Sequence, residues 1–509
     1  MMKRHAIRIC VFLGAVAVAP NLFGEATNPK HLDLRDGHRQ LFLDDLLLEK
    51  VENVHKEPGK VTKNPDNPVI KRDKPWDASR TDLYGSVVYD PENQRLQLFY
   101  SANNVPNGHE DRLAYAESRD GGKTWVKPEF DHIPYKEHQR TNLVMLPPSQ
   151  VMHGACVFRD KHETDPSKRY KLFTASYPDS AYLGIPGFYD YGGTHILATD
   201  NFDPNHPKLP PGCKLPGMYV AYSPDGIHWT CAEDRFSPML SDTAQCAFWD
   251  ERIGKYVAYV RARTKNDRSV ARMESKDFEN WSEPTVVLEG TPAQCLYSMG
   301  VVPYEGIYIG TPWIFDRGSE GRGGPVIWPE LAVSRDGIHW KRLFPGKPLI
   351  PTGPKGSPDS RQIRLASSWV VVGDEILFCY GQTDKPHTTV DMQIEIGTAT
   401  MRRDGFAAMV AGETEGSILT KPLQFQAGRL CINAVTEPDG FVKAELVDSA
   451  NRPLAGYELK SCRALTGDLL DGEVVWDGKT KVPEASGDGC RIRFVLKNAR
   501  LYSFWIAEQ

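Results

Sequence analysis

Two aspartates with matching surroundings are the residues of this sequence best suited to acid–base or nucleophilic chemistry. Asp82 in "RTDLYGS" and Asp242 in "LSDTAQCAFW" both precede an apolar run, and a second aspartate follows each of them eight residues later. Two carboxylates across a pocket can cleave a glycosidic bond, because one attacks the anomeric carbon or activates water while the other protonates the leaving oxygen. Taken alone, either aspartate is also explained as a strand-end cap or a turn residue.

Four copies of a short polar turn that ends in tryptophan recur along the chain. They read SRDGGKTW at 118–125, SPDGIHW at 223–229, SKDFENW at 275–281 and SRDGIHW at 334–340. An apolar strand precedes each turn and the tryptophan begins the next strand, which is the pattern of a β-hairpin. A degenerate fifth copy at 396–409 lacks the tryptophan.

A second hairpin lies upstream of each of these turns, so the repeating unit is four strands in about 40 residues, the length of one propeller blade. We therefore expect an all-β fold: a five-bladed β-propeller at 27–417 followed by a C-terminal β-sandwich at 418–509. The second region alternates apolar and polar residues between turns every eight to twelve residues, which is typical of a sandwich. The tryptophan turns belong to the outer hairpin of each blade and are expected to be structural.

The first 26 residues have the features of a signal peptide. "MMKRH" is basic, an apolar run follows, and small residues precede a cleavage site near Ala26. No later stretch has transmembrane length. The sequence thus predicts a secreted or periplasmic protein without membrane insertion.

Charge and cysteine spacing exclude several kinds of partner. The net charge is −5 and no basic stripe occurs, which argues against nucleic acid. The nine cysteines after residue 26 show no CxxC spacing, so we expect neither a metal site nor a cofactor. One disulfide among Cys431, Cys462 and Cys490 is open at this point, and so is the oligomeric state.

A propeller places the start of every blade's first strand at one mouth of the central channel, where a pocket can form. Besides Asp82 and Asp242, we expect four residues there to bind substrate: Arg80, His153, Tyr297 and Arg361. A long insert at 181–216 in the second unit is rich in Pro, Gly and aromatic residues. Its Tyr189 is a further substrate-binding candidate, either in a wall on which a sugar stacks or in the small core of the insert.

Two segments carry a resemblance to a known family. "TDLYGSVVYDPENQRLQLFYSANN" resembles the opening strand of the invertase–fructanase type of glycoside hydrolase, with Asp82 on its nucleophile and Gly85 on its motif glycine. "SDTAQCAFWDERIGKYVAYV" with "ESKDFENW" is similar to a later segment, with Asp242 on the transition-state-stabilising aspartate. The resemblance implies a distant member of the five-bladed propeller superfamily of invertases, fructanases and furanosidases. It implies an exported hydrolase that cleaves glycosidic bonds of an oligo- or polysaccharide.

The sequence departs from that family at the general acid. The family's acidic Glu-Cys pair should fall near "PAQCLYSMGVV" at 292–302, where no carboxylate occurs. Glu330 in "WPELAVS" is the substitute that we expect. Two other functions stay open: a non-catalytic carbohydrate-binding propeller that has lost the acid, and a sialidase-like hydrolase, which needs three arginines around a carboxylate.

Overall fold

The structure is a computed structural model of the 509-residue chain. It describes residues 31–103, 111–149, 151–177, 189–192, 195–198, 203, 205, 209, 212–318, 324–387, 389 and 392–508. The predicted signal peptide at 1–26 lies outside these residues. Apart from a 3-10 turn at Pro166–Lys168, every regular element described is a β-strand, so the all-β class is confirmed. None of the described helical segments has the length and hydropathy needed to cross a bilayer.

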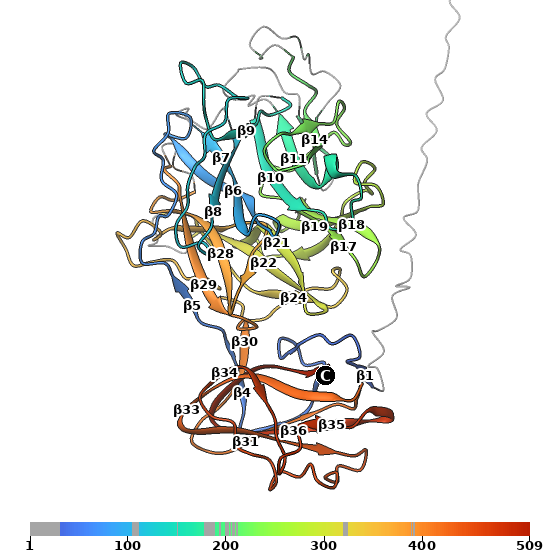
Figure 1. Ribbon diagram of the computed structural model, residues 1–509. Coiled ribbons are helices and arrows are strands. Elements are labelled where there is room, and N and C mark those ends of the chain that lie inside the picture. The colour runs from blue at the N-terminus through green and yellow to red at the C-terminus, as the bar shows by residue number, and fades with distance from the viewer. Residues whose placement is uncertain are drawn as a thin grey trace, which may run out of the picture.

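Five groups of antiparallel strands follow one another along the chain and are numbered sheets 1 to 5 (Figure 1); a parallel bridge joins sheets 4 and 5 into one ten-stranded sheet. A further three-stranded sheet contains β12 (Tyr189–Gly192), β13 (His195–Ala198) and β16 (Met239–Leu240). Sheet 1 contains β6 (Arg80–Asp90), β7 (Arg95–Asn103), β8 (Arg112–Ser118) and β9 (Leu143–Met145). Sheet 2 contains β10 (Val151–Arg159), β11 (Tyr170–Tyr177), β14 (Gly217–Ser223) and β15 (Thr230–Cys231). Sheet 3 contains β17 (Cys246–Asp250), β18 (Lys255–Thr264), β19 (Asp267–Ser275) and β20 (Thr285–Glu289). Sheet 4 contains β21 (Gln294–Tyr304), β22 (Ile307–Asp316), β24 (Ala332–Ser334) and β25 (Lys341–Arg342).

Sheet 5 is built from both ends of the repeat region. It contains β26 (Gln362–Leu365) and β27 (Val370–Val372), which both pair with β28 (Glu375–Thr383), and then β29 (Glu395–Arg402). Its last strand is β5 (Val61–Lys63), which precedes sheet 1 in the chain and pairs antiparallel with β29. A strand from before the first sheet therefore completes the last one.

The first strands of sheets 1, 2 and 3 contact one another through small buried side chains. The Val157 amide in β10 donates to Ser86 Oγ in β6 at 2.9 Å. The Ala247 amide in β17 donates to Cys156 Sγ in β10 at 3.2 Å. Because serine and cysteine are small, the strands approach closely enough for side chains to bond neighbouring backbone.

The same contacts continue through sheets 4 and 5 and return to sheet 1. The Val301 amide in β21 donates to Cys246 Sγ in β17 at 3.2 Å. β23 (Val326–Pro329) pairs with β22 and makes a parallel bridge to β26. The Ser367 amide of sheet 5 donates to the Gly85 carbonyl of β6 at 2.9 Å. Contacts therefore run from sheet 1 through sheets 2, 3, 4 and 5 and back to sheet 1; between sheets 4 and 5 the contact is made by β23, and the bond back to sheet 1 comes from Ser367, just after β26.

The four tryptophan turns share one hydrogen-bonding pattern. Ser223 Oγ accepts from the Gly226 amide at 2.9 Å, and Trp229 Nε1 donates to the Gly226 carbonyl at 2.9 Å. Both bonds recur in the other three copies. In the third copy Phe278 replaces the glycine at a φ of 69° and is fully buried, so its packing offsets an unfavourable backbone conformation.

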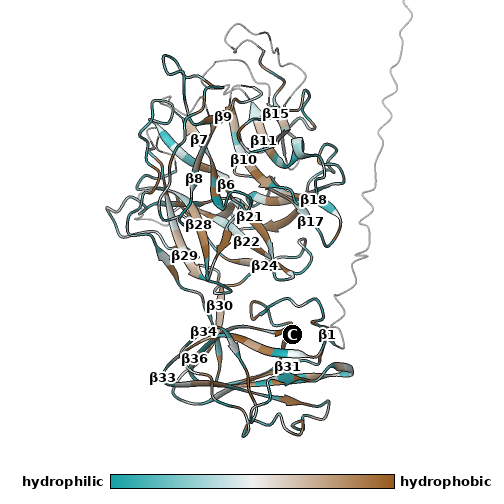
Figure 2. Cartoon of the chain, viewed as in Figure 1, coloured by the Kyte–Doolittle hydropathy of each residue, from teal (hydrophilic) through white to brown (hydrophobic). Residues whose placement is uncertain are grey.

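Strands from the two ends of the chain form a second unit of eleven strands, in the lower part of Figure 1. The N-terminal strands are β1 (Leu32–Asp33), β2 (Gln40–Leu41), β3 (Leu48–Glu52) and β4 (His55–Pro58). The C-terminal strands are β30 (Ala407–Ala411), β31 (Gly416–Thr420), β32 (Leu423–Phe425), β33 (Gly428–Val447), β34 (Asp468–Glu473), β35 (Lys481–Val482) and β36 (Ala485–Ala507). Apolar residues gather on the strands inside both units (Figure 2).

The predicted domain boundaries, 27–417 and 418–509, are therefore corrected. Residues 32–58 pair with strands of the C-terminal unit, and Leu34, Phe42 and Leu47 lie in its core. The boundary was wrong because the alternation of apolar and polar residues in a short strand does not indicate which sheet the strand joins. The nine cysteines after residue 26 are all free, so the disulfide considered among the three C-terminal ones does not form.

Asp404, in the turn between β29 and β30, connects the two units. It is fully buried, and Tyr304 of sheet 4 donates to its carboxylate at 2.5 Å. Arg39 and Ser503 of the C-terminal unit donate hydrogen bonds to the same carboxylate at 3.2 and 2.6 Å.

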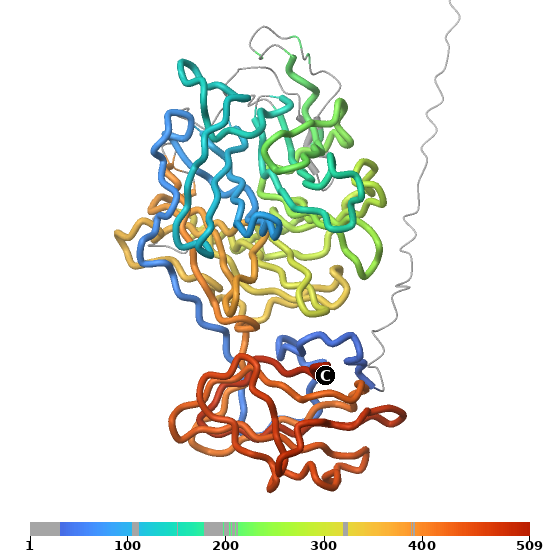
Figure 3. Tube along the Cα trace, in the orientation of Figure 1, coloured from blue at the N-terminus to red at the C-terminus, as the bar shows by residue number. Residues whose placement is uncertain are grey.

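The described part of the chain begins in the lower unit, continues through the five sheets above it and returns to the lower unit at its C-terminal end (Figure 3).

Candidate functional site

Four of the residues predicted from sequence lie in one network around the tyrosine Tyr84 of β6. Its ring centroid lies 4.7 Å from that of His153, and its hydroxyl donates to the Tyr297 hydroxyl at 3.0 Å. His153 Nε2 lies 3.0 Å from Asp242 Oδ1. Asp82 is two residues before Tyr84 in the same strand. The starts of β6, β10 and β21 and the segment before β17 therefore meet at one place.

Asp82 is held by a buried arginine. Arg364 Nη1 donates to Asp82 Oδ2 at 2.6 Å, and the two side chains are only 2% and 4% exposed. Burial by itself would lower the pKa of Arg364, but the Asp82 carboxylate and the Tyr84 hydroxyl raise it above its ordinary value. Gln362 fixes the other side of the guanidinium at 2.9 and 3.1 Å. Asp82 Oδ1 has no hydrogen-bond partner in the described part of the chain.

A tyrosine pair and a neutral histidine continue the network toward sheet 5. Trp313 stacks on both Tyr84 and Tyr297, at interplanar angles of 26° and 11°. The Tyr297 hydroxyl lies 2.9 Å from His387 Nε2. Burial, with Arg364 and other nearby arginines, lowers the pKa of His387 to about 3. His387 is therefore uncharged at neutral pH.

Asp242 is the solvent-accessible carboxylate of the network. Its side chain is 43% exposed, and His153 and Arg261 lie 3.0 and 3.4 Å from its oxygens. Burial would raise the pKa of Asp242, but the contact with His153 and the positive charges of His153, Arg261 and Arg268 hold it well below its usual range. Burial would lower the pKa of His153, but the Asp111 and Asp242 carboxylates raise it to about 10. At neutral pH the pair is an ionised carboxylate beside an imidazolium.

The raised pKa of His153 predicts a pH-dependent stability. Its pKa is about 10 in the folded protein against an ordinary 6.5, so its stabilisation is complete below 6.5 and lost as the pH rises through 10. We expect His153→Gln to cost about 3 kcal/mol of unfolding free energy near neutral pH and far less at alkaline pH. Denaturant unfolding across that range measures this. His228→Gln, at an exposed histidine that also pairs with an aspartate, should give a small difference; an equal loss at every pH would contradict the prediction.

The other predicted binding residues take different places. Arg80 begins β6, and its charge helps to lower the pKa of the buried Asp111 beside His153, so it borders the network. Arg361 precedes β26, and its amide donates to the Thr383 carbonyl. Arg364, three residues later in β26, supplies the guanidinium that bonds Asp82. Tyr189 lies in β12 (Tyr189–Gly192), which pairs with β13 (His195–Ala198); its side chain lies outside what the structure describes.

Glu330 does not fit the role of general acid. It is fully buried between β23 and β24, and Arg342 donates to its Oε2 at 2.6 and 2.8 Å. Its Oε1 accepts from the Gly346 amide at 2.8 Å and from Trp328 Nε1 at 3.3 Å. Both oxygens of this carboxylate are thus occupied by four hydrogen bonds from the surrounding fold, so Glu330 is not placed to protonate a leaving group. Glu330 is corrected to a structural ion-pair residue.

The sequence prediction missed several residues of the network. Arg261 lies within the apolar run "YVAYVRAR" of β18, and a charge inside a buried strand is a signal that was available. Tyr84 lies two residues after the predicted Asp82 in the same strand. His387 lies in the segment after β28, where no local pattern marks it.

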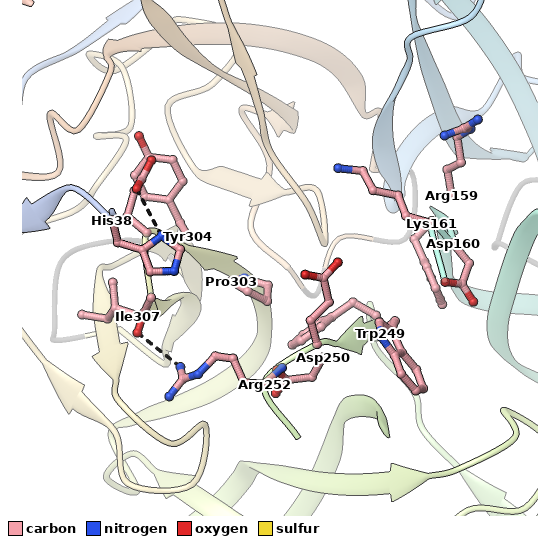
Figure 4. Close-up of a pocket in the computed structure, with 15 residues that line it drawn as sticks. His38, Arg159, Asp160, Lys161, Trp249, Asp250, Arg252, Pro303, Tyr304 and Ile307 are labelled. Carbon is pink, nitrogen blue, oxygen red and sulfur yellow. Dashed lines mark hydrogen bonds and ion pairs between the residues drawn. The ribbon is translucent and has the colours of Figure 1, made fainter. Parts of the chain in front are cut away.

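A separate cleft lies at the other end of the first strands (Figure 4). It has a volume of about 380 Å³, and the turns of sheets 2, 3 and 4 line it together with His38 of the N-terminal segment. Asp250, eight residues after Asp242, is part of its wall and accepts from the Arg252 amide at 3.1 Å. None of the predicted site residues lines this cleft. In both sheets the second aspartate is the last residue of the first strand and accepts a backbone hydrogen bond from the turn that follows.

Comparison with known proteins gives distant structural similarity only. No family model matches the chain, and no curated protein matches it. Among solved structures, a β-1,2-mannobiose phosphorylase from Listeria innocua is 10% identical, with 67% of this chain and 97% of that chain covered and a TM-score of 0.45. An α-L-arabinofuranosidase from Podospora anserina is 12% identical, with 70% and 98% covered and a TM-score of 0.39. An N-acetylgalactosamine deacetylase from F. plautii is 17% identical, with 70% and 97% covered and a TM-score of 0.42.

Proposed function

We propose that the five sheets are the blades of a five-bladed β-propeller and that the eleven-stranded unit is a β-sandwich. Two features support the propeller: the contacts that run from each sheet to the next and return to sheet 1, and the completion of sheet 5 by β5. In such a ring the first strands surround the axis, and their starts share one mouth. The network around Tyr84 lies at that mouth.

On this fold we propose an exported hydrolase that cleaves glycosidic bonds of an oligo- or polysaccharide. The observation that carries the proposal is the accessible, ionised Asp242 beside the protonated His153. A carboxylate at that position stabilises the positive charge that develops on the sugar ring as the bond breaks. Asp82 is the nucleophile or general base, because Arg364 orients it through Oδ2 and leaves Oδ1 without a partner.

His153 is the proton donor in this proposal. The carbon–oxygen bond breaks, the imidazolium gives its proton to the leaving oxygen, and Asp82 bonds the anomeric carbon or takes a proton from the attacking water. The negative charge of Asp242 raises the pKa of His153 in the resting protein. Positive charge forming on the sugar offsets that carboxylate, so the imidazolium becomes a stronger acid as the bond breaks.

A second candidate is non-catalytic saccharide binding at the same mouth. The observation that favours it is that Asp82 is 4% exposed and neutralised by Arg364. A carboxylate in that state would order the pocket without attacking a sugar.

A glycan panel separates the two candidates. We expect the wild-type protein to release new reducing ends from at least one oligosaccharide, and His153→Gln and Asp82→Asn to lose that release by about 10²-fold or more. Chromatography of the products and calorimetric binding are measured on the same samples. Binding without release in the wild-type protein would support the second candidate and contradict the hydrolase, whereas neither binding nor release would contradict both.

A further inference from the structure

One side of the mouth carries four arginines at the ends of adjacent strands. Arg261 and Arg263 end β18, Arg268 begins β19, and Arg317 follows β22. A single carboxylate, Asp267, serves three of them, at 2.7 Å from Arg263, at 2.9 Å from Arg268 and in contact with Arg317. One carboxylate cannot neutralise three guanidinium groups, so this side of the mouth holds excess positive charge.

The other carboxylates nearby do not remove this excess. Asp242 is shared between Arg261 and His153, which is itself positively charged. Asp316, at the end of β22, accepts from the Gln294 side chain and the Gly318 amide. Glu289 in β20 accepts from Thr264 and Asn266 at 3.2 and 2.7 Å. Among the described carboxylates, Asp267 is therefore the one that forms ion pairs with Arg263, Arg268 and Arg317.

The two inner arginines of the group face the aromatic wall of the network. The Arg261 guanidinium carbon lies 4.3 Å from the Tyr297 ring centroid, and that of Arg268 lies 5.5 Å from Tyr297 and 4.9 Å from Phe315. Their side chains are 3% and 18% exposed. The Nε atoms of both are buried without a hydrogen-bond partner among the described residues. Buried N–H donors without partners are expensive unless a ligand fills them.

The pKa of the neighbouring His387 is also affected by the positive charge of these arginines. His387 lies 2.9 Å from the Tyr297 hydroxyl and 5.1 Å from the Phe315 ring, centroid to centroid. After burial, three arginines lower its pKa: Arg364, Arg268 and Arg261. Burial disfavours charge of either sign, but the contribution of the three arginines shows that positive charge is concentrated beside His387, and that charge attracts an anion.

We propose that this arginine edge binds the oxyanion of an acidic saccharide, a hexuronate carboxylate or a sulfate ester, while the sugar ring lies at the Asp242 mouth. The inference rests on the saccharide site proposed above. Guanidinium groups match carboxylate and sulfate oxygens with paired, charge-assisted hydrogen bonds, and the stacked tyrosine and phenylalanine hold them in place. Free inorganic phosphate has the same chemistry, so the test separates it from an anion carried by the sugar.

The test uses pairs of oligosaccharides that differ in one group. Hexuronate trisaccharides and their carboxyl-reduced counterparts are titrated calorimetrically into the wild-type protein and Arg268→Gln. We expect the wild-type protein to bind at least one acidic member about tenfold more tightly than its reduced counterpart, and Arg268→Gln to bind the two equally. Arg268→Lys keeps the charge but not the paired donors, and is expected to retain part of the preference.

Arg252→Gln is the matched control. Arg252 also lies over a tyrosine, with its guanidinium carbon 4.7 Å from the Tyr308 ring centroid, but in the cleft at the opposite end of the strands (Figure 4). This variant loses the same charge and should keep the tenfold preference. Loss of the preference in Arg252→Gln instead of Arg268→Gln would overturn the assignment.

The remaining outcomes distinguish this inference from the proposed function. Equal binding of acidic and reduced members by the wild-type protein overturns the acidic-saccharide inference and leaves the saccharide site standing. Equal binding of the two sugars together with tight, Arg268-dependent binding of inorganic phosphate shows that the edge takes a free anion, which also overturns it. No binding of any saccharide overturns the proposed function itself.

Discussion

Replacing Asp242 by asparagine is expected to lower kcat/KM for saccharide cleavage about 10³-fold. Asparagine keeps the size of the side chain and a hydrogen-bonding oxygen for Tyr177, which donates to Asp242 at 3.3 Å. It removes the negative charge that stabilises the sugar cation in the transition state, so kcat should fall while KM changes little. Steady-state kinetics on the glycan that the panel identifies measure both quantities.

Two further measurements make this prediction specific. Asp225→Asn is the matched control, because Asp225 is 40% exposed and pairs with His228 at 2.8 Å, much as Asp242 pairs with His153. That variant lies in a tryptophan turn and should keep full activity. In Asp242→Asn the pKa of His153 should fall from about 10 toward its ordinary value, and the alkaline limb of the rate profile should move with it. Unchanged activity in Asp242→Asn would rule out its proposed role.

Removing the guanidinium of Arg364 is expected to cost about 3–5 kcal/mol of unfolding free energy. Arg364→Met leaves the Asp82 carboxylate buried without a counter-charge, and desolvation of an unpaired charge is the penalty. The combined variant with Asp82→Asn should recover much of that loss, because no charge is then left buried. Denaturant unfolding followed by tryptophan fluorescence measures the three variants.

An exposed pair provides the comparison. Lys50 and Glu52 lie 2.7 Å apart, with side chains 64% and 55% exposed. Lys50→Met should change the unfolding free energy by less than about 1 kcal/mol, because solvent screens an exposed pair. If Arg364→Met costs no more than Lys50→Met, the Asp82–Arg364 pair does not anchor the mouth.

The repeated tryptophan turns were enough to predict the all-β class, because serine, aspartate and glycine at fixed offsets bond the local backbone. Ser223 and Gly226 make those bonds within a few residues, so no distant contact is needed. The N-terminal strands were assigned to the wrong unit for the opposite reason. β1 to β4 pair with strands about 350 residues or more away, and an alternating pattern does not indicate which strand it pairs with.

The same division holds at the candidate site. Sequence spacing alone selected Asp82, His153, Asp242 and Tyr297, because they stand at equivalent positions before or within the first strands of four sheets. Their charge states were decided only by tertiary structure. Arg364 reaches Asp82 across 282 residues of chain, and the field that holds His153 protonated comes from two carboxylates on other segments. Glu330 is the opposite case. The sequence predicted it as the general acid, and only the tertiary structure shows that Arg342 forms an ion pair with it. Hydrogen bonds between neighbouring residues can be predicted from the sequence of a short segment. The burial and pairing of charged groups depend on which distant strands the fold brings together.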